Sequence, residues 1–164
     1  MQRRHDAVNH MLEKCLVDVD VSNVLTEQTS PKFDEDEETF DAAALRPDLN
    51  YVDFKSRRVH VDVEVCTMHA ARANSSTRAG ALIEHLEGVK RRKYNHLRLL
   101  PFVVSYLGRF GNSAQTIIKS TCRERDEAAR SKCISQFYQS IACAVQHGNA
   151  SLVAAAGHLD KAWL

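Results

Sequence analysis

Residues 59–65 alternate valine with a polar side chain without interruption, and this pattern constrains the fold more than any other in the chain. A period of two predicts a β-strand, because successive side chains of a strand point to opposite faces of a sheet. We expect the valines to face a core, while the other face carries a polar row made of His60, Asp62 and Glu64. Residues 49–54 form a second strand-like run, and the basic turn at 55–57 joins the two runs into a predicted β-hairpin.

Asp48 precedes the first strand of this hairpin and stands fourteen residues before Asp62. Because the separation is even, the two side chains share a face of the sheet if the connecting turn has an odd number of residues. Asp48, Asp62 and Glu64 would then converge. Converging carboxylates suit a hard divalent cation, Mg2+ or Mn2+, which binds phosphate oxygens in the hydrolysis of phosphodiesters. The sequence therefore predicts a metal site at these three carboxylates.

A long amphipathic helix is predicted over residues 76–95. Its expected buried stripe consists of Ala79, Leu82, Leu86 and Val89, with Ile83 beside them. Lys90 and Lys93 continue this stripe at helical steps, so we expect both to point towards the sheet, whereas Arg91 and Arg92 project sideways. A lysine beside a metal-bound phosphodiester can stabilise the phosphorane charge or orient the attacking water. The alternative is a solvated basic helix end, where cations are favoured by the helix dipole.

The N-terminal part of the chain changes its period twice. Residues 4–16 carry apolar side chains at helical spacing, which predicts an amphipathic helix. Residues 17–22 alternate valine with polar side chains, so a strand is expected there, extending towards Glu27. Residues 28–45 are polar, acidic and aperiodic, which predicts a solvated loop insertion.

The C-terminal part predicts one strand and then helices. Residues 99–107 are almost entirely apolar, with Pro101 near their start, which is typical of a buried central strand. Gly148 is expected to separate two of the three helices predicted over 113–122, 126–146 and 149–163. Residues 1–164 then form a single mixed α/β domain in the order α-β-β-β-α-β-α-α, with C-terminal helices over 123–164.

The charge of the chain is balanced in total but segregated along its length. The 22 Lys and Arg oppose 21 Asp and Glu, yet residues 34–41 hold six acids and no base, and residues 72–98 hold seven bases and two acids. The net charge of +1 gives no global argument for nucleic-acid binding. The longest apolar stretch, 99–104, is far shorter than the ~20 residues of a membrane span, so no membrane partner is expected. Five cysteines without a C-x-x-C pair predict reduced thiols in an intracellular protein.

Several short motifs, taken in order, resemble one known family. The first are Arg46-Pro47-Asp48-Leu49, Asp62-Val63-Glu64 and Lys90-Arg91-Arg92-Lys93-Tyr94. The others are Arg4-His5-Asp6-Ala7-Val8, Pro101-Phe102-Val103-Val104-Ser105 and Gln146-His147-Gly148-Asn149-Ala150. Together they resemble the PD-(D/E)XK restriction-like endonuclease domain found C-terminal to the reverse transcriptase of non-LTR retrotransposons. In that family the lysine lies on the following helix in a K-x-x-K-Y box, which the resemblance assigns to Lys90 and Lys93.

The resemblance implies a restriction-endonuclease-like mixed β-sheet flanked by helices, and Mg2+- or Mn2+-dependent nicking of double-stranded DNA. The nick would leave a 3′-OH for a reverse transcriptase on the same or a parent polyprotein, which implies a nuclear location. The implied catalytic residues are Asp48, Asp62, Glu64, Lys90 and Lys93, of which the carboxylates bind the metal. The implied nucleic-acid contacts are Arg91, Arg92, Tyr94, Arg4 and His5.

Alternatives stay open at the level of the sequence. The chain could be a nucleic-acid-binding remnant of such a polyprotein whose catalysis has decayed, or an unrelated α/β adaptor whose acidic run binds a basic partner. Arg4 and His5 could cap the first helix instead of contacting DNA, and Tyr94 could be a core aromatic. His60 is expected to be a surface strand residue outside the catalytic set.

Overall fold

The computed structural model describes residues 2–26, 47–66, 80–95 and 97–160. Within them the chain forms one four-stranded mixed sheet and four helices, so the prediction of a mixed α/β domain is confirmed. The elements are α1 (Gln2–Asp18), β1 (Ser22–Thr26), β2 (Leu49–Val52), β3 (Arg58–Cys66), α3 (Ala81–Lys93), β4 (Leu99–Ser105), α4 (Asn112–Thr121) and α5 (Glu127–Asp160). The strand order is β1-β2-β3-β4, antiparallel except for the parallel pair β3–β4.

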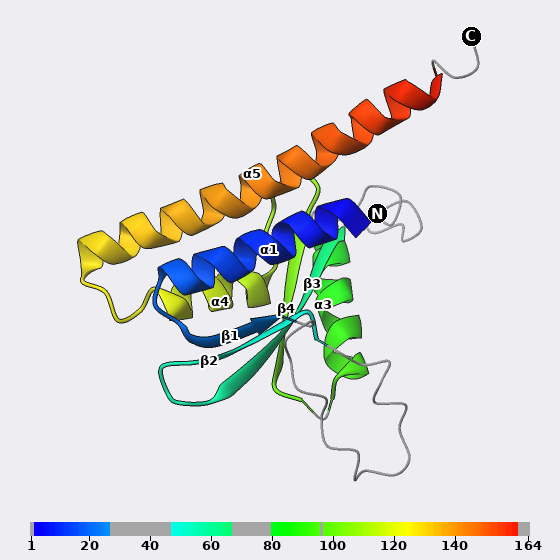
Figure 1. Cartoon of the computed structure of the whole chain (residues 1–164). Helices are drawn as coiled ribbons and strands as arrows, with labels where there is room; N and C mark the ends of the chain where they lie inside the picture. Colours follow the sequence, from blue (N-terminus) through cyan, green and yellow to red (C-terminus); the bar gives the residue numbers. More distant parts are fainter. Residues whose placement is uncertain (1, 27–46, 67–79, 96, 161–164) are drawn as a thin grey trace.

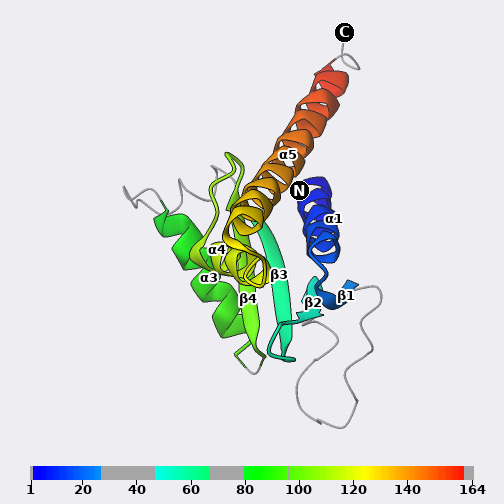
Figure 2. The same cartoon turned by 90° about the vertical axis from the view of Figure 1, so that its left-hand side faces the viewer.

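The sheet lies between two layers of helices (Figures 1 and 2). α1, α4 and α5 cover one face, and α3 covers the other. The larger core fills the space beneath α1, α4 and α5, and its fully buried members include Val8, Leu12, Leu16, Val61, Phe102, Ile117 and Ile141. A smaller core beneath α3 joins Ile83 to Cys66 and Val103.

The polar row of β3 is buried beneath α3. His60 and Asp62 are only 6% and 7% exposed, and Glu64 is half-buried. The expectation that His60 lies at the surface is therefore wrong, because alternation identifies the two faces of a strand but not what covers each face. A buried carboxylate requires hydrogen bonds or an opposite charge, so the surroundings of Asp62 decide the character of this face.

α1 runs past the predicted end at residue 16 and closes with a C-cap. The Val21 amide donates to the Leu16 carbonyl at 3.1 Å, and Asp20 has a left-handed backbone with φ of 61°. Both features are typical of a Schellman motif. The predicted strand start at Val17 is wrong, because this residue still belongs to α1 and β1 begins at Ser22.

β2 and β3 form the predicted hairpin, connected by a turn over residues 53–57. Asp53 holds this turn, because its Oδ1 accepts hydrogen bonds from the amides of Lys55 and Arg57 at 2.9 and 3.0 Å. The turn has an odd number of residues, which is the condition for the two aspartates of the hairpin to share a face.

β4 lies at the edge of the four-stranded sheet, where the sequence predicts a central strand. It pairs in parallel with β3, and α3 lies in the crossover connection that a parallel pair needs. Its residues are apolar because helices cover both faces, not because strands lie on both sides. An edge strand also tolerates Pro101, which has no amide hydrogen to donate to a neighbouring strand.

α5 is one continuous helix from Glu127 to Asp160, where the sequence predicts two helices separated at Gly148. A Cβ at position 148 would lie 2.5 Å from Cγ and 3.1 Å from Cα of Arg4. Gly148 therefore permits the close approach of α1 and α5 rather than ending a helix. Its helix penalty of about 1 kcal/mol relative to alanine is tolerated for this contact.

The cysteines differ from their prediction. Cys122 and Cys133 form a disulfide that joins the end of α4 to α5, so the prediction of five reduced thiols is wrong. Cys15 and Cys66 are buried free thiols, and Cys143 is an exposed one. The turn between α4 and α5 brings Cys122 and Cys133 together, and no sequence motif signals this pairing.

The acidic insertion over 28–45 lies outside the described residues. Among the helices of the described residues, none is long and apolar enough to cross a membrane.

Candidate active site

Asp48 and Asp62 are neighbours at the end of the β2–β3 hairpin opposite its turn. Leu49 is opposite Val61 in this antiparallel pair, so the next position outward sets Asp48 opposite Asp62. The main chain anchors the first carboxylate, because Oδ2 of Asp48 accepts a hydrogen bond from the Val63 amide at 2.6 Å. The register therefore brings the two carboxylates together, as their spacing predicts.

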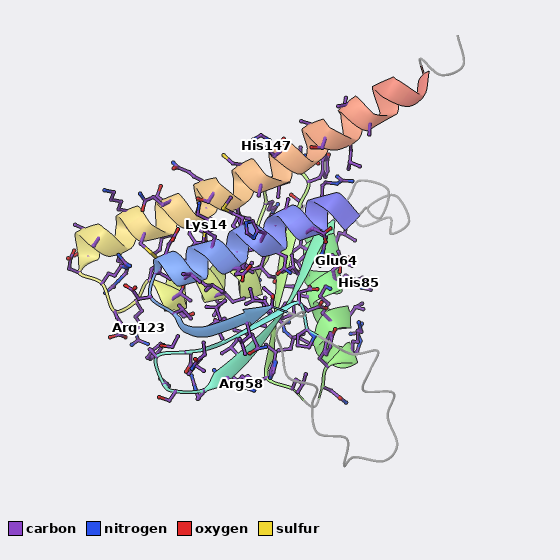
Figure 3. All side chains as sticks on the ribbon, viewed as in Figure 1. Lys14, Arg58, Glu64, His85, Arg123 and His147 are labelled. Carbon is purple, nitrogen blue, oxygen red and sulfur yellow. A yellow bond between two sulfur atoms is a disulfide. The ribbon has the colours of Figure 1, made fainter. Side chains whose placement is uncertain are left out.

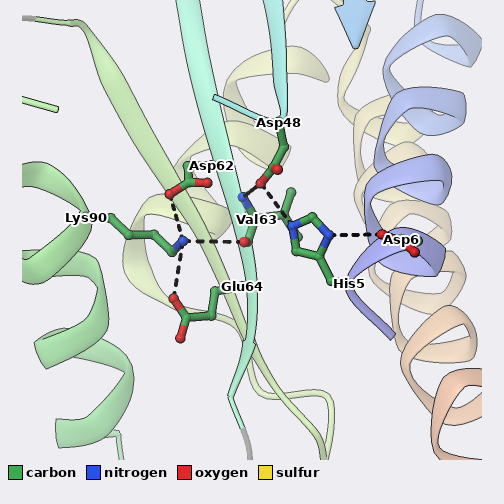
Figure 4. A network of polar contacts seen from close by, with 7 residues as sticks. All are labelled: His5, Asp6, Asp48, Asp62, Val63, Glu64 and Lys90. Atoms are coloured by element: carbon green, nitrogen blue, oxygen red, sulfur yellow. Dashed lines mark hydrogen bonds and ion pairs between the residues drawn. The ribbon is translucent and has the colours of Figure 1, made fainter. Parts of the chain in front are cut away.

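Lys90 reaches these carboxylates from α3 (Figure 4). Its Nζ donates to Oδ2 of Asp62 at 2.7 Å and lies 3.2 Å from Oε2 of Glu64. The carbonyl oxygen of Val63 is a third acceptor at 3.4 Å. Figure 3 shows Glu64 near the end of β3, beside α3. The prediction that Lys90 points towards the sheet is confirmed, and three oxygens surround its ammonium group.

The two aspartates differ in their affinity for a proton. Burial raises the pKa of Asp62 from 3.8 to about 6 against the hydrogen bond from Lys90, and the charge of Asp48 adds to this increase. Burial also opposes the ionisation of Asp48, but the hydrogen bond and the charge of His5 hold its pKa below the ordinary value. Asp48 is thus firmly ionised at neutral pH, whereas Asp62 takes up a proton in slightly acidic solution.

Two cations flank these carboxylates from opposite sides of β3, His5 from α1 and Lys90 from α3 (Figure 4). The hydrogen bond with Asp48 raises the pKa of His5 from 6.5 to about 9. Burial acts to lower the pKa of Lys90, but the hydrogen bond and charge of Asp62, together with the charge of Glu64, raise it. Both side chains are therefore cationic at neutral pH.

The side of α3 that faces the sheet matches the predicted apolar stripe in part. Leu82, Ile83 and Leu86 pack against the smaller core as predicted, and Ala79 lies outside the described residues. Glu87, Lys90 and Tyr94 complete this side of the helix. Val89, predicted to be buried, is 41% exposed. Glu87 is buried because Oε1 accepts a hydrogen bond from the Ser113 amide at 2.8 Å and Oε2 lies 3.4 Å from Nη2 of Arg91. Apolar periodicity does not detect this glutamate, since polar partners and not apolar neighbours make its burial possible.

Lys93 and Tyr94 do not join the carboxylates. Lys93 is exposed, and its Nζ lies 4.8 Å from the centroid of the Tyr94 ring. Side chains three residues apart on a helix differ in direction by about 60°, which separates Lys93 from Lys90. Tyr94 is 1% exposed. The prediction of a nucleic-acid contact at Tyr94 is therefore wrong, and the alternative of a core aromatic holds.

The three arginines predicted to contact nucleic acid differ in how accessible their side chains are. Arg92 is exposed on α3. Arg91 is also exposed in part, but its Nη2 donates to Oγ of Ser113 at the start of α4. Arg4 lies in α1, where Nη1 donates to Oδ1 of Asn149 at 3.0 Å and so ties α1 to α5. Of the three, Arg92 is the side chain most available for a phosphate.

His5 has a place that the sequence did not indicate. Its Nε2 lies 3.1 Å from Oδ2 of Asp48, and its Nδ1 lies 3.3 Å from Oδ1 of Asp6. The sequence suggests a DNA contact or a helix cap for His5, and no motif links it to Asp48. The contact joins residues 43 positions apart, so only the docking of α1 against the sheet creates it.

The donor set fits a hard cation in kind. Asp48, Asp62 and Glu64 offer carboxylate oxygens, the preferred ligands of Mg2+, and two of them already stabilise the ammonium group of Lys90. In the described part of the chain, however, no three His, Cys, Asp or Glu side chains are arranged to hold a metal ion. A metal bound here would have to share Asp62 and Glu64 with Lys90.

Comparison of the chain with models of protein families, with curated proteins and with solved structures finds no match.

Proposed function

We propose that this chain is a Mg2+-dependent DNA endonuclease of the restriction-like PD-(D/E)XK type, which nicks double-stranded DNA for the insertion of a retroelement. The observation that carries the proposal is the proximity of Asp48, Asp62, Glu64 and Lys90, which come from three separate segments of the chain. The pKa of Asp62, raised to about 6 by burial, supports it. Strongly perturbed pKa values with a specific charged partner are concentrated at functional sites.

The charge balance of the site suits a divalent cation. The polar residues of Figure 4 include four carboxylates, on Asp6, Asp48, Asp62 and Glu64, against the cations His5 and Lys90. With all of them ionised, the net charge is −2, which one bound Mg2+ or Mn2+ would neutralise. A cation bound there would also favour the ionised form of Asp62.

The residues then have distinct roles. Asp48, Asp62 and Glu64 would hold Mg2+ or Mn2+, which when bound supplies Lewis acidity to the scissile phosphate and acidity to a bound water. Lys90 holds a positive charge beside the carboxylates, where it would stabilise the charge that develops on the phosphorane. Lys93 lies outside this group and would contact the DNA backbone instead.

The exposed basic side chains of α3 give the proposal its DNA surface. Arg92 and Lys93 lie one helical turn or less from Lys90, and Arg91 is beside them. Contacts of this kind to phosphates give affinity that falls with salt and little sequence preference. The proposed partners are double-stranded DNA and a reverse transcriptase on the same or a parent polyprotein, with action in the nucleus.

A supercoiled-plasmid nicking assay tests the proposal. We expect the wild-type chain to convert supercoiled plasmid to nicked circle in Mg2+ or Mn2+, but not in EDTA, and to leave a 3′-OH that a DNA polymerase extends. Asp62→Ala should lose nicking by more than ~100-fold, because even the outer partners of metal ligands contribute 10–100-fold. Glu84→Gln is the matched control, since Glu84 is an exposed acid on α3.

A decayed nucleic-acid-binding remnant is the second candidate. The observation that favours it is the position of Lys90, whose ammonium group already bridges Asp62 and Glu64. It predicts salt-sensitive DNA binding by the wild-type chain, with no nicked product in either metal and no effect of Asp62→Ala on binding. That result would exclude the nuclease.

A further inference from the structure

We propose that His5 is a positioning residue for Asp48, whose carboxylate it holds in the orientation used to bind the metal. The inference rests on the proposed nuclease function and deepens it, since it assigns to α1 a part in a site otherwise built from the sheet and α3. Its basis is the contact between Nε2 of His5 and Oδ2 of Asp48 at 3.1 Å.

The hydrogen bonds that Asp48 accepts from His5 and from the Val63 amide are on the same oxygen. Oδ2 receives Nε2 of His5 from one side and the Val63 amide, at 2.6 Å, from the other. A carboxylate oxygen has two lone pairs, so these two donors occupy Oδ2. They also prevent rotation of the carboxylate about its χ2 bond, since rotation would break both bonds at once. Oδ1 accepts neither of these two hydrogen bonds, and a cation shared with the neighbouring Asp62 would bind to it.

The imidazole ring is itself held on its other nitrogen. Nδ1 of His5 lies 3.3 Å from Oδ1 of Asp6, so a carboxylate is within reach of each ring nitrogen. These two contacts fix the orientation of the ring at two points. Outer partners of this kind orient metal ligands, and their loss weakens metal binding 10–100-fold.

The position of His5 is fixed by the packing of α1. The neighbouring Arg4 donates to Asn149 at 3.0 Å and packs against Gly148, so the first turn of α1 is tied to α5. Val8, one helical turn after His5, is fully buried in the core. These contacts place the imidazole before any metal or DNA arrives, as a positioning role requires.

The test compares three variants of the full chain. His5→Ala removes the donor, His5→Gln retains an amide N–H at a similar reach, and His10→Ala is the matched control. His10 lies on the same helix, has a 79% exposed side chain and is 3.7 Å from Glu13. The primary readout is the affinity for Mn2+ alone, measured by electron paramagnetic resonance without DNA. The second is the Mg2+ concentration that gives half-maximal plasmid nicking.

We expect His5→Ala to weaken Mn2+ binding and raise the half-maximal Mg2+ concentration by ~10–100-fold. His5→Gln should recover most of this loss, and His10→Ala should match the wild type. Thermal unfolding in EDTA identifies any variant that fails to fold. If His5→Ala does not fold, the comparison of His5→Gln with a His5→Leu variant replaces it, with the same expected difference.

Two results would overturn the inference. If wild type and His5→Ala bind Mn2+ equally, His5 has no positioning role, although nicking by the wild type would still support the nuclease. If His5→Gln is as defective as a folded His5→Ala, the hydrogen bond is not the operative contact. Failure of the nuclease proposal is distinct, because the wild type itself would then show neither Mn2+ binding nor nicking, and both proposals would be lost.

Discussion

Replacement of Asp62 by asparagine should stabilise the metal-free protein. The reason is that the folded chain disfavours the ionised form of this side chain: burial raises its pKa from 3.8 to about 6 in spite of the hydrogen bond from Lys90. Asparagine keeps the shape and one acceptor oxygen but carries no charge. A carboxylate retained mainly for structure would show the opposite result, because its removal would leave Lys90 without its nearest partner.

The magnitude follows from the pKa of Asp62. One pKa unit corresponds to about 1.4 kcal/mol, so ionised Asp62 costs the folded state about 3 kcal/mol relative to the unfolded chain. The folded-state pKa is raised, so the folded chain retains its proton between pH 4 and 6 while the unfolded chain loses it. The cost is therefore absent below about pH 4, grows as the pH rises to about 6, and is constant above that.

Urea unfolding in EDTA measures this effect. At pH 8 the Asp62→Asn variant should be more stable by up to about 3 kcal/mol, which moves the urea midpoint upward by about 1–2 M. At pH 4 the two proteins should have nearly equal midpoints. Asp53→Asn is the control, and it should lower the stability at pH 8. Hydrogen bonds from Arg57 outweigh the effect of burial there and lower the pKa of Asp53. A destabilised Asp62→Asn at pH 8, or a gain independent of pH, would refute the reasoning.

Other predictions follow from single contacts. Gly148→Ala should destabilise the chain by ~1–3 kcal/mol because its Cβ would meet Arg4, whereas Gly88→Ala should be neutral or stabilising by up to about 1 kcal/mol; equal urea midpoints would contradict this. Lys93→Ala should weaken DNA binding and reduce the slope of log affinity against log salt concentration by about 1, while nicking persists at saturating protein. Loss of nicking would instead show that Lys93 is catalytic. In an NMR titration in EDTA, His5 should have a midpoint near pH 9. The stability that its contact with Asp48 gives the fold is complete below about pH 6.5 and is lost as the pH rises to about 9. A midpoint near pH 6.5 would show that the contact is absent.

The fold class was predictable because periodicity reports burial directly. The valines of 59–65 identified β3, and the odd turn between β2 and β3 set Asp48 opposite Asp62. Where tertiary packing competes with a local signal, the local signal failed. The alternation at 17–22 misplaced the start of the strand, because α1 packs on the sheet and is capped only after these residues begin. Gly148 lies inside α5, where its close contact with Arg4 requires a glycine.

The candidate site was predictable where the position of a residue in its own strand or helix sets the direction of its side chain. Asp62 and Glu64 lie on one strand, and Lys90 lies on the next helix, so spacing alone orients them. His5 was missed in its actual role because its contact depends on the docking of α1 against the sheet. Glu87 was missed because apolar periodicity gives no signal for a buried glutamate with polar partners. The disulfide of Cys122 and Cys133 depends on the turn between α4 and α5.

The location of a divalent ion in crystals of the protein tests the proposed metal centre most directly. Crystals soaked in Mn2+ and measured at its absorption edge should give an anomalous peak within ~2.5 Å of oxygens of Asp48 and Asp62, the distance of carboxylate ligands around hard divalent cations. The peak should disappear in Asp62→Asn crystals. A well-ordered site without a peak, or a peak elsewhere on the chain, would contradict the assignment of these carboxylates as the metal centre of a nuclease.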